Sequence, residues 1–177
     1  MKKELLYISI SILMLACVES KKINGEAING DPYSGIVNAN DEKAKIFENN
    51  IKLFSQNDFS YVHKYVAKNF TLKTATDTTV VANGPEEAIN YWKNIHTIFD
   101  EISFEKGLLQ THYQNNGDVW TSYFGTLYAK GKFTGNDIVI PIDAWIKWDN
   151  DKIIQQIDML DSKYILKEIE ASENINE

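Results

Sequence analysis

The chain of 177 residues contains no arginine, a single cysteine and no long uninterrupted apolar segment. One cysteine can form no disulfide within the chain, and it cannot supply a thiolate cluster for a metal. The formal net charge is −7, and the side chains that bind phosphates in a bidentate manner are absent. We therefore expect no nucleic-acid partner and no direct attraction to anionic lipid headgroups.

The apolar stretch near the N-terminus runs only from Leu5 to Ala16, whereas a membrane-spanning helix needs ~20 residues. A charged start, a short apolar stretch and a small residue before the cleavage point are typical of a secretory signal. The end of this stretch, with Leu15 and Cys17, resembles the lipobox of bacterial lipoproteins. The resemblance implies that residues 1–16 are a signal peptide and that a lipid on Cys17 anchors the protein in a bacterial cell envelope, on its periplasmic or outer-surface side. The alternative is an ordinary signal peptide followed by an unrelated cysteine.

The segment after the cysteine is rich in Lys, Asn, Gly, Ser and Pro and shows no apolar period. Such a composition buries too little surface to fold alone, so residues 17–40 are predicted to form a flexible tether. The length that remains fits one domain, predicted at 41–162. A C-terminal tail at 163–177 is expected to begin with a short helix and to fray at its acidic end.

The spacing of apolar residues changes along the predicted domain. Intervals of three and four predict a helix at 41–57 and a shorter one at 59–66. Asn83, Gly84 and Pro85 form a strong helix start, and this third helix is expected to end near Phe99. Before this helix, two short strands are predicted at 70–74 and 78–82, around a polar turn. After Asp100, alternating residues predict four long strands, which we place at 104–113, 119–128, 138–148 and 153–160. Helices followed by antiparallel strands predict an α+β fold in which the sheet curls around the helices.

Three stretches occur in a characteristic order, beginning with FENNIKLFSQNDFSYVHKYVAKNFTLKT, then NGPEEAINYW and then PIDAWIKWDNDKIIQQIDMLD. Their order and spacing resemble the nuclear transport factor 2-like superfamily, specifically its SnoaL-like and ketosteroid-isomerase-like branch. The resemblance implies a cone-shaped fold, in which a curved antiparallel sheet wraps three N-terminal helices. It also implies an open, mainly apolar pocket that binds a small molecule, and no cofactor.

Asp143 stands among apolar residues, where a buried charge is costly, so it points out to solvent, has a partner or lies in a pocket that uses it. The resemblance implies that Asp143 projects into the pocket. There it would stay protonated and donate a hydrogen bond, as an Asp does in ketosteroid isomerases. Alternation puts Trp145 on the same strand face, so that both residues line the pocket if that face is the inner one. On the next strand Asp158 shares a face with Gln156 and Leu160, which makes it a second candidate catalytic carboxylate.

Two positions depart from the isomerase pattern. The resemblance places the general base at Thr74, whose hydroxyl cannot abstract a carbon-bound proton at neutral pH without a base beside it. It places the second oxyanion donor, a tyrosine in the isomerases, at Asn50. Further predicted ligand contacts are Tyr91, Trp92 and His96. The histidines lack metal-ligand spacing, so we expect no metal site.

Three functions therefore stay open. The first is a tethered module that binds a small apolar molecule without chemistry, which the loss of the base favours. The second is an isomerase, cyclase or dehydratase that uses Asp143 and Asp158. The third is a protein-interaction domain in an envelope complex. Aromatic residues on both faces of the strand at 119–128 also predict that a second copy covers the outer side of the sheet.

Overall fold

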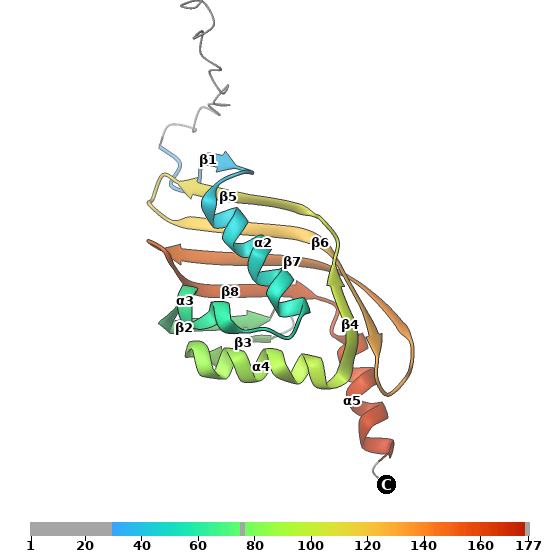
Figure 1. Ribbon diagram of the computed structural model, residues 1–177. Helices are drawn as coiled ribbons and strands as arrows, with labels where there is room; N and C mark the ends of the chain where they lie inside the picture. The colour runs from blue at the N-terminus through green and yellow to red at the C-terminus, as the bar shows by residue number, and fades with distance from the viewer. Residues whose placement is uncertain (1–29, 75–76, 176–177) are drawn as a thin grey trace, which may run out of the picture.

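The computed structural model describes residues 30–74 and 77–175, which form one curved sheet with helices α2, α3 and α4 on one of its faces (Figure 1). The helices are α2 (Glu42–Ser55), α3 (Ser60–Tyr65), α4 (Gly84–Ile98) and α5 (Lys163–Ile175). The strands are β1 (Gly35–Asn38), β2 (Val66–Thr74), β3 (Asp77–Asn83), β4 (Phe99–Phe104), β5 (Leu108–Gln114), β6 (Val119–Gly131), β7 (Asp137–Asp149) and β8 (Lys152–Leu160). The predicted signal peptide and Cys17 lie outside the described residues.

Seven of the eight strands in the described residues follow the order β1-β5-β6-β7-β8-β2-β3, and the eighth, β4, pairs with the far end of β6. All pairs are antiparallel except β2 with β8, which run parallel. The predicted α+β class and the curved sheet around three helices are confirmed, whereas the sheet is mixed rather than wholly antiparallel. The parallel pair arises because β8, which forms a hairpin with β7, has β2 at its other edge, and β2 runs in the same direction.

The helix starts follow the local sequence. Asp41 is the N-cap of α2, and its carboxylate accepts a hydrogen bond of 2.9 Å from the Ala44 backbone N–H. Gly84 opens α4 with a φ of +76°, a conformation that glycine adopts without a steric penalty, and Pro85 follows in the first turn. Both predicted helix starts are therefore confirmed, and α4 ends one residue before the predicted end.

The strand predicted at 104–113 is interrupted. The chain leaves β4 after Phe104 and enters β5 at Leu108, because Gly107 lies against the backbone of β6. A Cβ atom on Gly107 would lie 2.1 Å from the carbonyl oxygen of Phe124, so no larger residue fits there. One predicted strand thus becomes two that pair with different parts of β6.

The sheet begins within the segment predicted as a tether. Residues Gly35–Asn38 form β1, which lies at the edge of the sheet and pairs with β5. The backbones approach so closely that a Cβ atom on Gly35 would lie 1.9 Å from the carbonyl oxygen of Tyr113. Composition alone missed this strand because its pairing partner lies far away in the sequence.

Helix α5 is longer than the short helix predicted for the tail, and a buried carboxylate fixes it to the turn between β6 and β7. Glu168 is 1% exposed and accepts hydrogen bonds from the Phe133 N–H at 2.9 Å, the Thr134 N–H at 3.3 Å and the Thr134 hydroxyl. Burial alone would raise the pKa of Glu168, but these hydrogen bonds together hold that pKa below its ordinary value.

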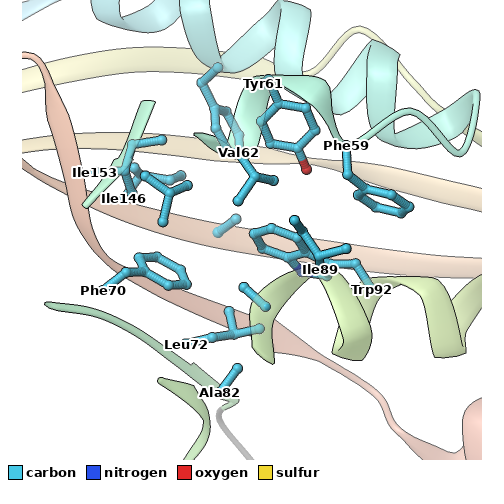
Figure 2. Packing of buried hydrophobic residues seen from close by; sticks show 14 of the residues in the cluster. Phe59, Tyr61, Val62, Phe70, Leu72, Ala82, Ile89, Trp92, Ile146 and Ile153 are labelled. Carbon is cyan, nitrogen blue, oxygen red and sulfur yellow. The ribbon is translucent and has the colours of Figure 1, made fainter. Parts of the chain in front are cut away.

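The main core lies between the helices and the inner face of the sheet. The rings of Tyr61 of α3 and Trp92 of α4 have centroids 6.2 Å apart, and Ile146 and Ile153 belong to the same cluster (Figure 2). A second cluster, around Ile98 and Ile138, lies under α5. Within residues 30–74 and 77–175, no helix combines the length and apolar character that crossing a membrane requires.

Candidate ligand-binding cavity

A cavity of about 100 Å³ lies between α2, α3, α4 and the inner face of the sheet. Its wall is formed by 22 residues, and most of them are aliphatic or aromatic. An engineered cavity of about 150 Å³ in another protein holds a benzene molecule, so this space suits a compact group of a few heavy atoms. The polar residues on the wall are Asn50, Tyr61, Tyr91, Tyr123, Gln156 and Asp158.

Strand pairing decides which side chains of β8 reach the cavity. Asp158 lies directly opposite Ala144 of β7, and Leu160 lies opposite Ile142. Residues opposite each other in a sheet share a face, and these four all line the cavity. The structure therefore brings Asp158 and Leu160 to the inner face, together with Gln156, as the alternation within β8 predicts.

The expected position of Asp143 in the pocket is wrong. The even-numbered residues of β7, such as Ile142 and Ala144, face inward, so Asp143 and Trp145 face outward. Asp143 pairs with Phe124, which is 59% exposed on the outer face. The physical reason is the pleat of the strand, since burying the apolar even-numbered set forces the odd-numbered set to the other side.

The other outward residue, Trp145, belongs to an aromatic cluster on the outer face of the sheet. Its ring lies 5.4 Å from that of His112 and 6.5 Å from that of Trp120. The expectation that Trp145 is a wall of the pocket is therefore wrong as well.

Asp158 is the carboxylate that the structure does place at the cavity. Its two oxygens accept hydrogen bonds of 2.9 and 3.0 Å from the amide nitrogen of Gln156. Burial raises the pKa of Asp158 to about 6, although the bond from Gln156 lowers it in part. Burial also raises the pKa of Tyr91, and the negative charge of Asp158 raises it further.

Thr74 lies beside this carboxylate. In the parallel pairing of β2 with β8, Thr74 is in register with Asp158. The family resemblance assigns the general base to Thr74. Although Thr74 is no base, the residue opposite it on β8 is a carboxylate, Asp158. A carboxylate whose pKa lies near the working pH is suited to proton transfer.

Asn50 of α2 is a buried polar residue whose side chain lacks hydrogen-bond partners. It lines the cavity and is 3% exposed, and neither its amide nitrogen nor its amide oxygen has a hydrogen-bond partner among the described residues. Leaving a buried donor or acceptor unpaired costs about 1–3 kcal/mol, so such groups are rare in native proteins. An unpaired amide at a cavity wall is available to a ligand.

Of the three predicted ligand contacts on α4, two line the cavity and one does not. Tyr91 and Trp92 line the cavity, as expected. His96 instead packs behind the wall, where its ring lies 5.0 Å from that of Phe54 and 5.9 Å from that of Phe59. Burial lowers the pKa of His96, which favours the neutral imidazole.

Several aromatic wall residues were not among the predicted site residues. Tyr61, Phe104 and Tyr123 line the cavity together with Phe47 and Phe54 of α2. The helical spacing of Phe47, Asn50 and Phe54 could have identified the α2 contribution, because these positions share one face. Tyr61 could not be identified in this way, since the short helix α3 offers too few turns for a period to emerge.

No group of three or more His, Cys, Asp or Glu side chains lies close enough to hold an ion in the portion of the chain that the structure describes. The cavity wall itself offers a single carboxylate among its 22 residues.

Comparison with known proteins identifies the fold. No family model matches the sequence, and no curated protein matches it. Among solved structures, a candidate SnoaL-like polyketide cyclase from Shewanella putrefaciens is similar to it with a TM-score of 0.57 and 13% identity, over 73% of this chain and 97% of that one. A nuclear transport factor 2-like protein of unknown function from Burkholderia pseudomallei is similar with a TM-score of 0.55 and 10% identity, over 72% of this chain and 97% of that one.

A third solved structure is similar in fold and contains a small molecule. It is a protein from Catenulispora acidiphila with a ketosteroid-isomerase-like fold, in complex with trimethylamine, with a TM-score of 0.51 and 10% identity, over 64% of this chain and 83% of that one. At these identities the likeness shows the fold alone. The chain therefore has the SnoaL-like, nuclear transport factor 2-like fold that its sequence predicts.

Proposed function

We propose that the cavity binds a small, mainly apolar molecule without catalysing a reaction on it. The observation that carries this proposal is an apolar cavity of about 100 Å³ whose wall holds the unpaired amide of Asn50 and the carboxylate of Asp158. Binding sites for small molecules are mostly apolar and contain a few polar groups that orient the ligand. The trimethylamine complex of a protein with a similar fold supports small-molecule binding by this architecture.

The second candidate is an enzyme of the isomerase, cyclase or dehydratase kind. One observation favours it, namely that Asp158 lies in register with Thr74, at the position that the family resemblance gives to the general base. A mechanism that uses Asp143 and Asp158 together is excluded, because the two carboxylates lie on opposite faces of the sheet. Any such enzyme would rely on Asp158 alone as its carboxylate.

We further propose that a lipid on Cys17 holds this domain at a membrane of the bacterial cell envelope. The support comes from the sequence before the described residues, where a short apolar stretch leads to Leu15-Ala16-Cys17. The test is fractionation of cells that express the full chain. The wild type is expected in the membrane fraction, and Cys17→Ser is expected to leave it.

The binding proposal is tested by native mass spectrometry on the full-length protein, purified gently from the envelope of its own host. A reproducible extra mass that disappears on denaturation would show a filled cavity and allow the ligand to be identified. The released compound is then incubated with fresh protein. Recovery of the unchanged compound supports a binding module, whereas a new mass supports the enzyme. An empty protein would contradict tight binding and favour an interaction role in an envelope complex.

A further inference from the structure

We propose that the molecule bound in this cavity carries a compact organic ammonium group, paired with the carboxylate of Asp158 and surrounded by the aromatic side chains of the wall. This inference rests on the proposed binding function and names the chemical class of its ligand. It draws on three features of the cavity: its charge, its aromatic content and its size.

The charge of the cavity is unbalanced. Asp158 is the one charged residue among the 22 that line the cavity in the described part of the chain. The five salt bridges between described residues do not include it, and its partner is the neutral amide of Gln156. Buried carboxylates are normally paired with a cation or lose their charge. A ligand cation would supply the missing partner.

The wall has the composition of a cation-binding cage. Eight of the 22 lining residues are aromatic, among them Tyr61, Trp92 and Tyr123. The Tyr61–Trp92 and Phe104–Tyr123 pairs are tilted or edge-to-face, with interplanar angles of 34° and 72°, so parallel stacking does not cover their ring faces. The face of an aromatic ring attracts a cation, and more so where water is excluded.

The size of the cavity and its ligand atoms favour an organic cation over a metal ion. Calcium prefers six to eight carboxylate, carbonyl and water oxygens, whereas the side chains of this wall offer one carboxylate and two amide oxygens besides three tyrosine hydroxyls. An ammonium group with three methyl substituents presents an apolar surface to apolar walls and fits a volume of about 100 Å³. The acidic chain, with a net charge of −7, also attracts cations to its surface.

The test compares two probes that differ in charge and hardly in shape, choline and its carbon analogue 3,3-dimethylbutan-1-ol. Each is titrated calorimetrically into the full-length protein in a non-ionic detergent, whose headgroup carries no ammonium. We expect choline to bind about tenfold more tightly than the alcohol, or better. Asp158→Asn is expected to remove this preference, because the amide has nearly the same shape and no charge.

The control variant is Asp143→Asn, which removes a carboxylate from the outer face of the neighbouring strand and should leave the preference unchanged. Equal affinities for the two probes in the wild type would overturn the ammonium inference and leave the binding function standing. A preference that survives Asp158→Asn would overturn the assignment to Asp158. If neither probe binds, the binding function and the inference both fail for molecules of this size.

Discussion

Asp158 should lower the stability of the empty protein at neutral pH, and Asp158→Asn should restore it. The folded pKa of about 6 lies above the ordinary value of 3.8, so folding disfavours the ionised carboxylate. The free energy of unfolding therefore falls as the pH rises from about 4 to about 6, and it stays lower at higher pH. A pKa difference of this size corresponds to about 3 kcal/mol.

Asparagine keeps the shape of the side chain and cannot ionise. We therefore expect the free energy of unfolding of Asp158→Asn, relative to that of the wild type, to rise by up to about 3 kcal/mol between pH 4 and pH 7.5. The assay is urea denaturation of both proteins at several pH values, with the free energies of unfolding subtracted at each pH. The subtraction cancels every other titrating group that the two proteins share.

Asp143→Asn is again the matched control, since it makes the same chemical change at a carboxylate on the outer face of the neighbouring strand, away from the cavity. If the difference in free energy of unfolding between Asp158→Asn and the wild type does not change with pH, the reasoning is refuted. That result would mean that Asp158 has the same pKa in the folded and unfolded chains. A difference that falls with rising pH would show that an unrecognised cation already stabilises the charge.

Three further predictions concern other parts of the molecule. Glu168→Ala should lower the free energy of unfolding by about 1–3 kcal/mol at pH 7 in urea denaturation. This loss should become smaller as the pH falls below 4.5, because the hydrogen bonds that lower the pKa of Glu168 stabilise only its ionised form. Asn50→Leu should raise the melting temperature in calorimetry, since it removes a buried amide without partners, and a lower melting temperature would contradict this reading. Phe124→Asp should convert the dimer predicted through the outer face into a monomer in sedimentation equilibrium, whereas an unchanged mass would argue against that interface.

Local sequence signals predicted the helices and the long strands because their causes are local. The N-cap at Asp41 and the glycine–proline start of α4 act within one turn of the helix. The break at Gly107 and the strand β1 have causes that lie elsewhere in the chain. Gly107 must be small because it meets the backbone of Phe124, and Gly35 because it meets that of Tyr113. Neither contact can be inferred until the strand pairing is known.

The prediction that Asp143 faces the pocket was wrong for a different reason, because the alternation of residues in its own strand already indicates that it faces outward. Counting from Ile138 to Trp148, every even-numbered residue of β7 is apolar, whereas the odd-numbered set includes Asp143 and Lys147. The pleat alone assigns the even-numbered set to the core. The family resemblance pointed to the opposite face, and a shift of one residue exchanges the two faces of a strand completely.

The neighbouring strand β8 breaks the same rule, and there the break is informative. Its apolar residues Ile157 and Met159 face outward, while Gln156 and Asp158 face the cavity. A strand that served only the core would turn the opposite way, since burying a carboxylate costs free energy and burying isoleucine gains it. Proteins depart from such local rules mainly at functional sites. The inward carboxylate of β8 therefore supports both proposals, that the cavity binds a small molecule and that this molecule carries a positive charge.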